Sequence, residues 1–550
     1  MGSIQSKTNR INHKLLIVWD LILKNQGLGG EAKDTVWDLL VIGGGATGLG
    51  VAVQAALEGR RVTLVEARDF AAGTSSRSTK LLHGGVRYLA QGRWRLVREA
   101  LRERATVLAL APHLAQPLAF VVPGKGWWSW AWTGLGLKAY QWLSGRMSLG
   151  ATTALSKQAL LRCLPGLPGL PGLPGLPRMV AGMRYWDGQF EDARLALALA
   201  KTARQAGASV HNHMRVTALA PSAQGWQVSL FNERDGQTST LQARCVVNAT
   251  GVWVDALRQM VLQPWAGQEP VKALVKPSQG VHLVVARERL PIQEAVLIPR
   301  TADGRVLFAV PWLGATLIGT TDTPRGDAPL EPLPLQEELD FLFRETRQSL
   351  GVSLTRADVR SVWVGLRPLV DKAQGGLTSQ MSREHLIRRE APGMFTVTGG
   401  KWTTYRSMAA QVMHAMLEHH DLPSAAQEPA KTGQHRLVGA PDAGQAVHAI
   451  SEAPGLHLWG SEAAQVLALP GAEHDLGMGL TEAMVRFAAR NEWALTVEDM
   501  LARRWRALFL DARQAARMAP AVAALLQAET GIDPQLDAFL ALCRRYTLAD

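Results

Sequence analysis

The chain has 550 residues, of which 47% are hydrophobic and 19% charged, so it is long and apolar enough for two or three folded domains. Its net charge of +12 favours anionic partners, but it carries no arginine-rich tract with interleaved aromatics and no recognisable nucleic-acid module, so nucleic acid is not expected. The three cysteines are odd in number and far apart, which argues against a disulfide framework or a zinc knuckle, and we expect no metal.

The first 33 residues form an extension ahead of the first expected domain. Their apolar run at 15–19 is too short to span a bilayer and lacks a small-residue cleavage site, so no signal peptide is expected. No later stretch has the length of a transmembrane helix. The pattern then predicts a strand at 38–42, a helix at 46–57 that ends at Gly59, and a second strand at 61–66.

Short strands are predicted further on at 208–210, 225–230 and 244–249. Between about 270 and 320 the pattern becomes one of short strands separated by turn residues, which is typical of an antiparallel sheet. These strands are expected at 281–286, 295–298, 305–310 and 315–318. From about 415 onward Ala, Leu, Glu and Arg recur with helical spacing, which predicts a helical C-terminal domain. The fourfold Leu-Pro-Gly repeat at 164–177 predicts an exposed polyproline-like loop.

Glycines follow the first strand with the spacing of a dinucleotide fingerprint. Gly43 allows a tight turn, Gly45 lets a pyrophosphate approach the backbone, and Gly48 lets helix and strand pack closely. Glu66 ends the second strand, where an acid can hydrogen-bond an adenosine ribose. FAD and NAD share this fingerprint, so the segment that follows has to distinguish them.

That segment is rich in hydroxyl groups. Residues 74–80 read Thr-Ser-Ser-Arg-Ser-Thr-Lys, and His83, two glycines, Arg87 and Tyr88 come soon after. Hydroxyl groups alone would fit a polar surface loop. Their combination with histidine, glycines and arginine instead favours a loop that faces a ligand.

Several motifs together resemble one flavoprotein family. The run from Ser75 to Tyr88 resembles the second signature of the FAD-dependent, aerobic-type glycerol-3-phosphate dehydrogenases, within the D-amino-acid-oxidase-like flavoprotein superfamily. The resemblance covers roughly residues 35–520; the first 33 residues and the Leu-Pro-Gly repeat have no counterpart, and Trp402 stands where a smaller apolar residue is typical. Further motifs similar to those of the family follow in the expected order at 247–253, 318–323, 365–369, 399–406, 491–493 and 503–505.

The resemblance implies an α/β fold with an α+β cap: a Rossmann-like FAD-binding domain, an antiparallel β-sheet substrate cap and a helical C-terminal domain. FAD is the implied cofactor. We expect the N-terminal extension at 1–33, a discontinuous FAD-binding domain at 34–115, 180–258 and 360–415, the cap at 116–179 and 259–359, and the helical domain at 416–550.

The resemblance also implies oxidation of sn-glycerol 3-phosphate to dihydroxyacetone phosphate by hydride transfer to FAD. Arginine suits phosphate because its planar fork donates two parallel hydrogen bonds, and histidine suits the base because its pKa lies near neutrality. Which histidine is the base and which arginine holds the phosphate stay open. The expected catalytic residues are His83, His282, Arg87, Arg367 and Lys401, and the expected substrate-binding residues are Arg87, Tyr88, His282, Arg367 and Arg383.

The fingerprint and the resemblance together select the residues expected to bind FAD. They are Gly43, Gly45, Gly48, Glu66, Thr74, Ser75, Ser76, Ser78, Lys80, Val216, Ala249, Gly251, Gly399, Gly400, Lys401 and Thr403.

The electron acceptor is expected to be a membrane quinone. Tryptophans, a tyrosine and flanking cations cluster at 125–146, which suits a lipid headgroup interface, although an aromatic core would explain the same residues. We therefore expect a peripheral protein on the cytoplasmic face of the inner membrane, with an anionic lipid surface as partner, a cytoplasmic location otherwise, and a homodimer as an option. The alternatives are a soluble oxidase that uses oxygen, an amino-acid-oxidising relative and a non-catalytic flavin-binding protein.

Overall fold

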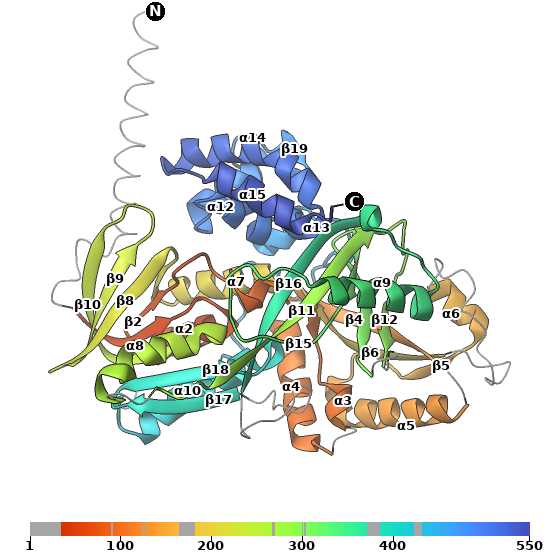
Figure 1. The fold of residues 1–550 in the computed structure, drawn as a ribbon, viewed down its shortest axis with the longest axis horizontal. Helices are drawn as coiled ribbons and strands as arrows, with labels where there is room; N and C mark the ends of the chain where they lie inside the picture. The colour runs from red at the N-terminus through yellow and green to blue at the C-terminus, as the bar shows by residue number, and fades with distance from the viewer. Residues whose placement is uncertain are drawn as a thin grey trace, which may run out of the picture.

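The structure is a computed structural model that describes residues 35–89, 92–124, 127–163, 182–266, 270–299, 301, 304–370, 385–422 and 432–549, without the side chains of residues 87, 127–130, 157, 161, 265 and 266. The expectations for the N-terminal extension, for the Leu-Pro-Gly repeat and for Arg383 lie outside these residues. The fold is mixed α/β, with two large sheets and a helical C-terminal region (Figure 1).

The first sheet has a parallel centre with the strand order β17-β18-β10-β1-β2-β7, and β8 and β9 extend it as an antiparallel hairpin beside β10. Its central strands are apolar and buried, as expected for a sheet covered on both faces. The strands are β1 (Val36–Ile42), β2 (Val62–Val65), β7 (Ser209–His211), β8 (Met214–Ser222), β9 (Gly225–Asn232), β10 (Thr238–Asn248), β17 (His385–Ala391) and β18 (Met394–Gly399).

The helix that follows β1 packs against two helices from later parts of the chain. Helix α2 (Ala46–Leu57) has the predicted bounds and contacts both α7 (Asp192–Gln205) and α10 (Tyr405–Glu418). Close packing depends on glycine, because a Cβ atom on Gly50 would lie 2.8 Å from the Tyr405 ring. Helix α8 (Val254–Ala266) contacts β8 and β18. The predicted strand–turn–helix–strand unit is therefore confirmed.

The second sheet has ten strands in the order β15-β11-β14-β13-β12-β4-β6-β3, with β16 beside β11 and β5 beside β6. The antiparallel pattern predicted between 270 and 320 is confirmed for β11 to β14, and one parallel pair joins β12 to β4. The strands are β3 (Leu81–Leu82), β4 (Ala115–Pro123), β5 (Thr153–Leu155), β6 (Gly182–Phe190), β11 (Val275–Ala286), β12 (Ala295–Ile298), β13 (Leu307–Trp312), β14 (Ala315–Gly319), β15 (Thr323–Pro324) and β16 (Val359–Val370).

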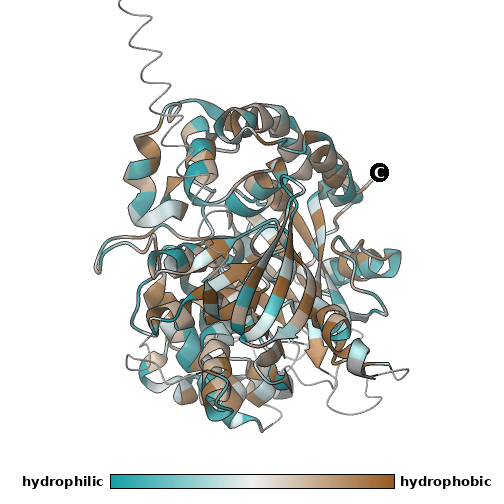
Figure 2. Ribbon diagram, turned by 90° about the vertical axis from the view of Figure 1, so that its left-hand side faces the viewer, coloured by the Kyte–Doolittle hydropathy of each residue, from teal (hydrophilic) through white to brown (hydrophobic). Residues whose placement is uncertain are grey.

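Strands β6 and β16 fall in segments that the sequence assigned to the FAD-binding domain, yet both belong to the second sheet. The chain thus crosses between the sheets more often than a simple domain division implies. Helix α9 (Gln336–Leu350) packs on this sheet through a separate apolar cluster, while the largest cluster joins both sheets to the C-terminal helices. Figure 2 shows these apolar residues gathered on the strands inside the molecule.

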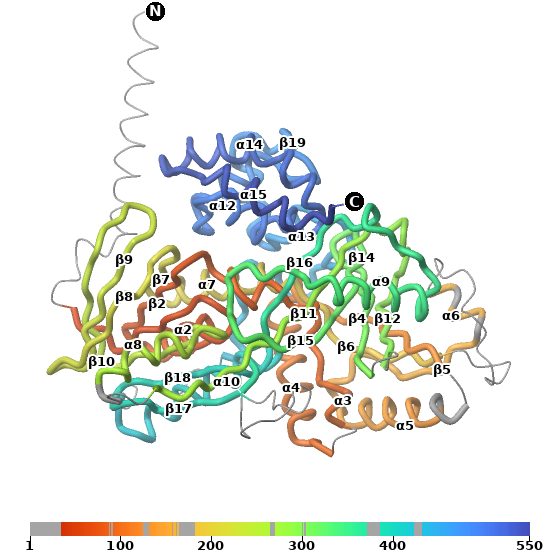
Figure 3. The backbone as a smooth tube through the Cα atoms, viewed as in Figure 1, coloured from red at the N-terminus to blue at the C-terminus, as the bar shows by residue number. Residues whose placement is uncertain are grey.

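The C-terminal region is helical, as predicted, with one short hairpin made by β19 (Asp475–Gly477) and β20 (Leu480–Thr481). In Figure 3 its helices lie above the two sheets, whereas α5 (Trp127–Ser144) runs along the opposite edge. The C-terminal helices are α11 (Ala463–Leu467), α12 (Glu482–Asn491), α13 (Ala507–Leu510), α14 (Ala512–Thr530) and α15 (Leu536–Tyr546).

Helices α3 (Val86–Leu89), α4 (Trp94–Leu110) and α5 (Trp127–Ser144) lie near the lower edge of Figure 1. Helix α6 (Lys157–Cys163) follows β5. In the part of the chain that the structure describes, no helix is both long enough and apolar enough to cross a membrane.

Candidate active site

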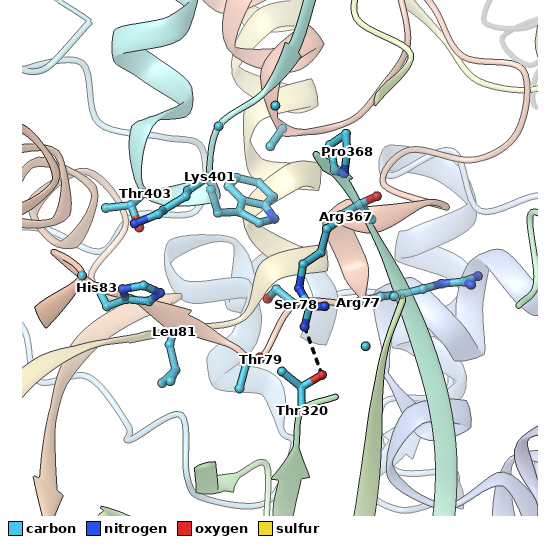
Figure 4. Close-up of a pocket in the computed structure, with 18 of the residues that line it drawn as sticks. Arg77, Ser78, Thr79, Leu81, His83, Thr320, Arg367, Pro368, Lys401 and Thr403 are labelled. Carbon is cyan, nitrogen blue, oxygen red and sulfur yellow. Dashed lines mark hydrogen bonds between the residues drawn. The ribbon is translucent and has the colours of Figure 1, made fainter. Parts of the chain in front are cut away.

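A single cavity of about 2060 Å³ extends between the two sheets, from the glycine-rich turn after β1 to the middle of the second sheet. It is larger than the roughly 300–1,000 Å³ typical of small-molecule pockets, so it can hold an extended dinucleotide together with a small substrate. Figure 4 shows its inner part, with His83 and Lys401 at the left of the view and Arg367 and Thr320 to their right.

The glycine-rich turn forms one end of the cavity. Gly43 has a φ of +113°, and a Cβ atom there would lie 2.6 Å from the carbonyl oxygen of Ala249. Gly48 does not line the cavity, because it packs α2 against the turn: a Cβ atom on it would lie 1.9 Å from the carbonyl oxygen of Gly43. Gly45 does line it, at the first turn of α2, where helix N–H groups favour a phosphate.

Glu66 lies beside this turn at the end of β2. Its carboxylate accepts hydrogen bonds from the backbone N–H of Gly44 at 2.7 Å and of Arg68 at 2.9 Å. Burial raises the pKa of Glu66, and the two backbone donors oppose that shift. Each carboxylate oxygen can accept a second hydrogen bond, so Glu66 can both hold the turn and bind a ribose hydroxyl.

The hydroxyl-rich loop is divided between the cavity and the protein interior. Thr74, Ser75 and Ser78 line the cavity. The Ser75 Oγ accepts the N–H of Ala46 at 3.0 Å, which fixes the loop to the start of α2. Trp402 donates its indole N–H to the Ser75 carbonyl at 2.8 Å and thereby links two of the motifs.

Ser76 and Lys80 do not line the cavity, although both were expected to bind the cofactor. Lys80 is fully buried; its Nζ bonds Asp192 at 2.7 Å and the Ser76 carbonyl at 2.9 Å. Burial lowers the pKa of Lys80 to about 8, despite the opposing charge of Asp192. The ammonium also lies 4.8 Å from the centroid of the Trp363 ring. Lys80 therefore supports the cavity wall from behind.

The other residues expected at the cofactor come together from distant segments. Gly399 and Gly400 have φ angles of +79° and +75°, which turn the chain sharply after β18. The Nζ of Lys401 lies 4.2 Å from the centroid of the Tyr88 ring. Of the residues expected at the cofactor, those that line the cavity here are Val216, Ala249, Gly251, Gly399, Gly400, Lys401 and Thr403. Tyr88, expected at the substrate, lines it as well.

His83 and His282 both line the cavity, in different settings. His83 follows β3 and is half-buried. His282 lies on β11 with 2% of its surface exposed, its ring stacked on Trp363 at 4.1 Å between centroids. Its Nε2 is 3.0 Å from the Thr79 hydroxyl. Burial lowers the pKa of His282 well below its ordinary value, and the charges of Lys80 and Arg367 lower it further, so the ring is neutral at pH 7.

Arg367 reaches the cavity from β16 and bonds the hydroxyl of Thr320 (Figure 4). It also bonds the carboxylate of Asp322. Arg87 belongs to α3, but its side chain is outside the described residues, as is the whole of Arg383. The structure therefore brings His83, His282, Arg367 and Lys401 into one cavity and leaves the other two arginines as predictions.

Thr79 and Asp322 also line this cavity, and the sequence analysis gave neither a role. Both occur inside quoted motifs, so their hydroxyl and carboxylate groups were visible signals. Only the fold shows that Thr79 contacts His282 and that Asp322 contacts Arg367.

The C-terminal region reaches the same loops through buried ion pairs. Asp69, close to Glu66 in sequence, accepts hydrogen bonds from Arg504 at 2.9 Å and Asn212 at 3.0 Å. Arg506 is fully buried and pairs with Glu191 at 3.1 Å. The motif at 503–505 therefore has a structural position, because its Arg504 docks the helical region on the loop that follows β2. Arg506, directly after the motif, docks the same region on the residue that precedes α7.

The residues present fit FAD. A Cβ atom at Gly43 would overlap the backbone of Ala249, and Gly45 leaves the start of α2 open to a pyrophosphate. The fold and this site define a flavoprotein oxidoreductase with a Rossmann-like cofactor domain and a β-sheet cap.

Comparison with known proteins identifies the family. The family model described as FAD dependent oxidoreductase matches residues 38–413, and that of the C-terminal domain of alpha-glycerophosphate oxidase matches residues 430–536. The mitochondrial glycerol-3-phosphate dehydrogenase of Homo sapiens is 36% identical over 533 residues, which cover 90% of this chain and 71% of the human one. The mitochondrial enzyme of Arabidopsis thaliana is 36% identical over 536 residues, with 90% and 82% covered.

Among solved structures, the glycerol-3-phosphate dehydrogenase of Bacillus halodurans complexed with FAD aligns with a TM-score of 0.72 and 28% identity, covering 94% of this chain and 97% of that one. The chain belongs to the FAD-dependent glycerol-3-phosphate dehydrogenase family, and its cofactor is FAD.

Proposed function

We propose that the chain oxidises sn-glycerol 3-phosphate to dihydroxyacetone phosphate and passes the electrons to a membrane quinone. The two mitochondrial relatives are named glycerol-3-phosphate dehydrogenases, and each matches nine-tenths of the chain. The observation that carries the proposal is that His83, His282, Arg367 and Lys401 line one cavity with the dinucleotide fingerprint. The chemistry that bound FAD supplies is acceptance of a hydride from the C2 carbon.

The protein must bind the phosphate, take the hydroxyl proton and stabilise negative charge on the C2 oxygen. Arg367 and Lys401 are two of the cationic side chains that line the cavity. The low pKa of His282 opposes full protonation, so we assign it a hydrogen bond to the substrate and assign the base to His83. The Thr79 hydroxyl fixes the His282 ring.

The quinone proposal rests on the cavity mouth. Trp94, Trp132 and Leu135 line the cavity, and 49%, 71% and 62% of their surfaces are exposed. Trp142, on the same helix as Trp132, is 79% exposed, and Lys138 lies between them on the surface. Tyr140 is instead buried, so α5 has an inner and an outer face. Exposed tryptophans beside cations suit an anionic lipid surface, and we propose peripheral attachment at the cytoplasmic face of the inner membrane.

The test is anaerobic. The yellow protein is purified in detergent, sn-glycerol 3-phosphate is added, and flavin absorbance is followed near about 450 nm, the usual region for oxidised flavin. We expect bleaching, and recovery when a quinone analogue is added. A fully loaded flavin that does not bleach would contradict the proposed substrate.

Two controls separate the rival activities. Steady peroxide production with oxygen and no added acceptor would favour an oxidase over the quinone-linked enzyme. Bleaching by glycine or a D-amino acid, and none by glycerol 3-phosphate, would favour an amino-acid-oxidising relative.

A further inference from the structure

The guanidinium of Arg367 is held by several protein oxygens. Its Nη1 donates to Asp322 Oδ1 at 3.2 Å and to the Gln279 carbonyl at 3.3 Å. Its Nη2 donates to the Thr321 carbonyl at 3.0 Å and to the Thr320 hydroxyl at 3.2 Å. Both terminal nitrogens are thereby fixed, and so is the direction in which the charge faces the cavity.

Asp322 is the one anion among these four acceptors. Its Oδ1 also accepts a hydrogen bond from the hydroxyl of Ser278, which is fully buried on β11. Ser278 and Arg367 are direct partners in the β11–β16 register, so two paired strands fix both ends of the arrangement. Asp322 itself is about three-quarters buried, with 24% of its side chain exposed.

Space for the guanidinium comes from Gly280. A Cβ atom there would lie 2.3 Å from Arg367 Nη2 and 2.4 Å from the Thr320 hydroxyl oxygen. Gly280 on β11, the Thr320 hydroxyl after β14 and the Asp322 carboxylate therefore surround the guanidinium of Arg367. These contacts restrain a long side chain that would otherwise sample many rotamers.

We propose that Asp322 is a positioning residue for the reaction: it anchors Arg367 so that the guanidinium faces the anionic substrate. The proposal rests on the proposed function for the identity of that substrate. Asp322 acts through Arg367, but its carboxylate also lines the cavity and places a negative charge there. With Arg367 present its charge is paired, and without Arg367 it repels an anionic substrate.

Removing the Asp322 charge should therefore change kcat/KM in opposite directions, depending on whether Arg367 is present. Asp322→Asn in the wild-type background should lower kcat/KM about tenfold or more, because Arg367 loses its anchor. In an Arg367→Ala background the same substitution should leave kcat/KM unchanged or raise it, because it removes an unpaired carboxylate beside the substrate. A residue that serves only the fold would lower activity in both backgrounds.

Two further variants complement this double-mutant cycle of Asp322 and Arg367. Ser278→Ala keeps both charges and removes one bond to Asp322, so it should lower kcat/KM by roughly threefold, and only when Arg367 is present. Asp327→Asn is the matched control: Asp327 bonds Arg325 at 2.7 Å, is 62% exposed and lies five positions further along the chain. It should leave kcat and KM within about twofold of wild type.

A second readout does not depend on the substrate. The oxidised, FAD-loaded proteins are treated with phenylglyoxal, and modification of Arg367 is quantified by peptide mass spectrometry. We expect Arg367 to react several-fold faster in Asp322→Asn than in wild type and in the Asp327→Asn control, because an unanchored guanidinium is more accessible.

The outcomes separate the two proposals. Faster modification of Arg367 in a protein that glycerol 3-phosphate does not bleach would retain the anchoring role and reject the substrate. Bleaching by glycerol 3-phosphate, with equal losses from Asp322→Asn in both backgrounds, would overturn the positioning role. Unchanged Arg367 reactivity in Asp322→Asn would also overturn it.

Discussion

Glu492 is a buried carboxylate that joins the C-terminal region to α7. Its side chain is fully buried and accepts hydrogen bonds from both terminal nitrogens of Arg194, at 2.7 and 2.9 Å, and from Lys201 at 3.4 Å. Burial alone would raise the pKa of Glu492, but Arg194 and Lys201 lower it to about 2 from an ordinary value of 4.5. Because the folded pKa is the lower one, this carboxylate stabilises the protein above pH 4.5, and the stabilisation is lost as pH falls toward 2.

The magnitude follows from that shift. Each pKa unit corresponds to about 1.4 kcal/mol, so a shift of this size contributes about 3 kcal/mol at neutral pH. Glu492→Gln removes this contribution and leaves Arg194 buried without its carboxylate partner, whereas Lys201 keeps its ion pair with Glu462. Breaking a buried pair in this way costs roughly 3–5 kcal/mol. We expect the variant to lose about 3 kcal/mol of unfolding free energy at neutral pH.

The assay is urea unfolding of the FAD-loaded protein, followed by tryptophan fluorescence, at about pH 7 and about pH 4. Glu492→Gln should unfold at a lower urea concentration near pH 7, with a smaller difference from wild type in acid. The matched control is Glu233→Gln, which removes an ion pair to Arg215 whose two side chains are 48% and 28% exposed and should cost under about 1 kcal/mol. Equal midpoints for Glu492→Gln and wild type near pH 7 would refute the reasoning.

Three further predictions can be checked independently. Arg367→Ala should lower kcat/KM at least about a hundredfold, or about 3 kcal/mol, in a flavin-loaded protein assayed with a soluble dye, and near-normal kinetics would remove Arg367 from the site. Replacing Trp142 and Lys138 together with serine should weaken co-sedimentation with anionic liposomes and preserve dye-linked activity; undiminished sedimentation would contradict docking through α5. Burial lowers the pKa of His113 to about 3, so the unfolding free energy should fall by about 2 kcal/mol as the pH is lowered from about 7 to about 5. Urea midpoints of His113→Gln should fall less over this range than those of wild type, and an equal fall would show that His113 does not cause the acid sensitivity.

The sequence by itself determined the elements whose signals are local. The helix at 46–57 has its predicted bounds, because a glycine-rich turn precedes it and Gly59 follows its last turn. The family motifs at 247–253 and 399–406 were also readable, and the comparisons confirm the family and the cofactor. Strand ends were predicted less well. The strand predicted at 244–249 is β10, which begins at Thr238 because its polar first residues pair with β9, and no apolar run marks that part.

Tertiary structure decided which side chains of those motifs meet. Lys80 sits in a polar loop like any ligand-binding lysine, but the fold buries it against Asp192, and it does not reach the cavity. Asp322 and Arg367 are 45 positions apart, and the carboxylate meets the guanidinium because β11 pairs with β14 and β15, which flank Asp322, and also with β16, which carries Arg367. Local patterns fix backbone conformation, because propensity and burial act over a few residues. The charge partner of a side chain depends on strand register and long-range packing, which no short pattern encodes.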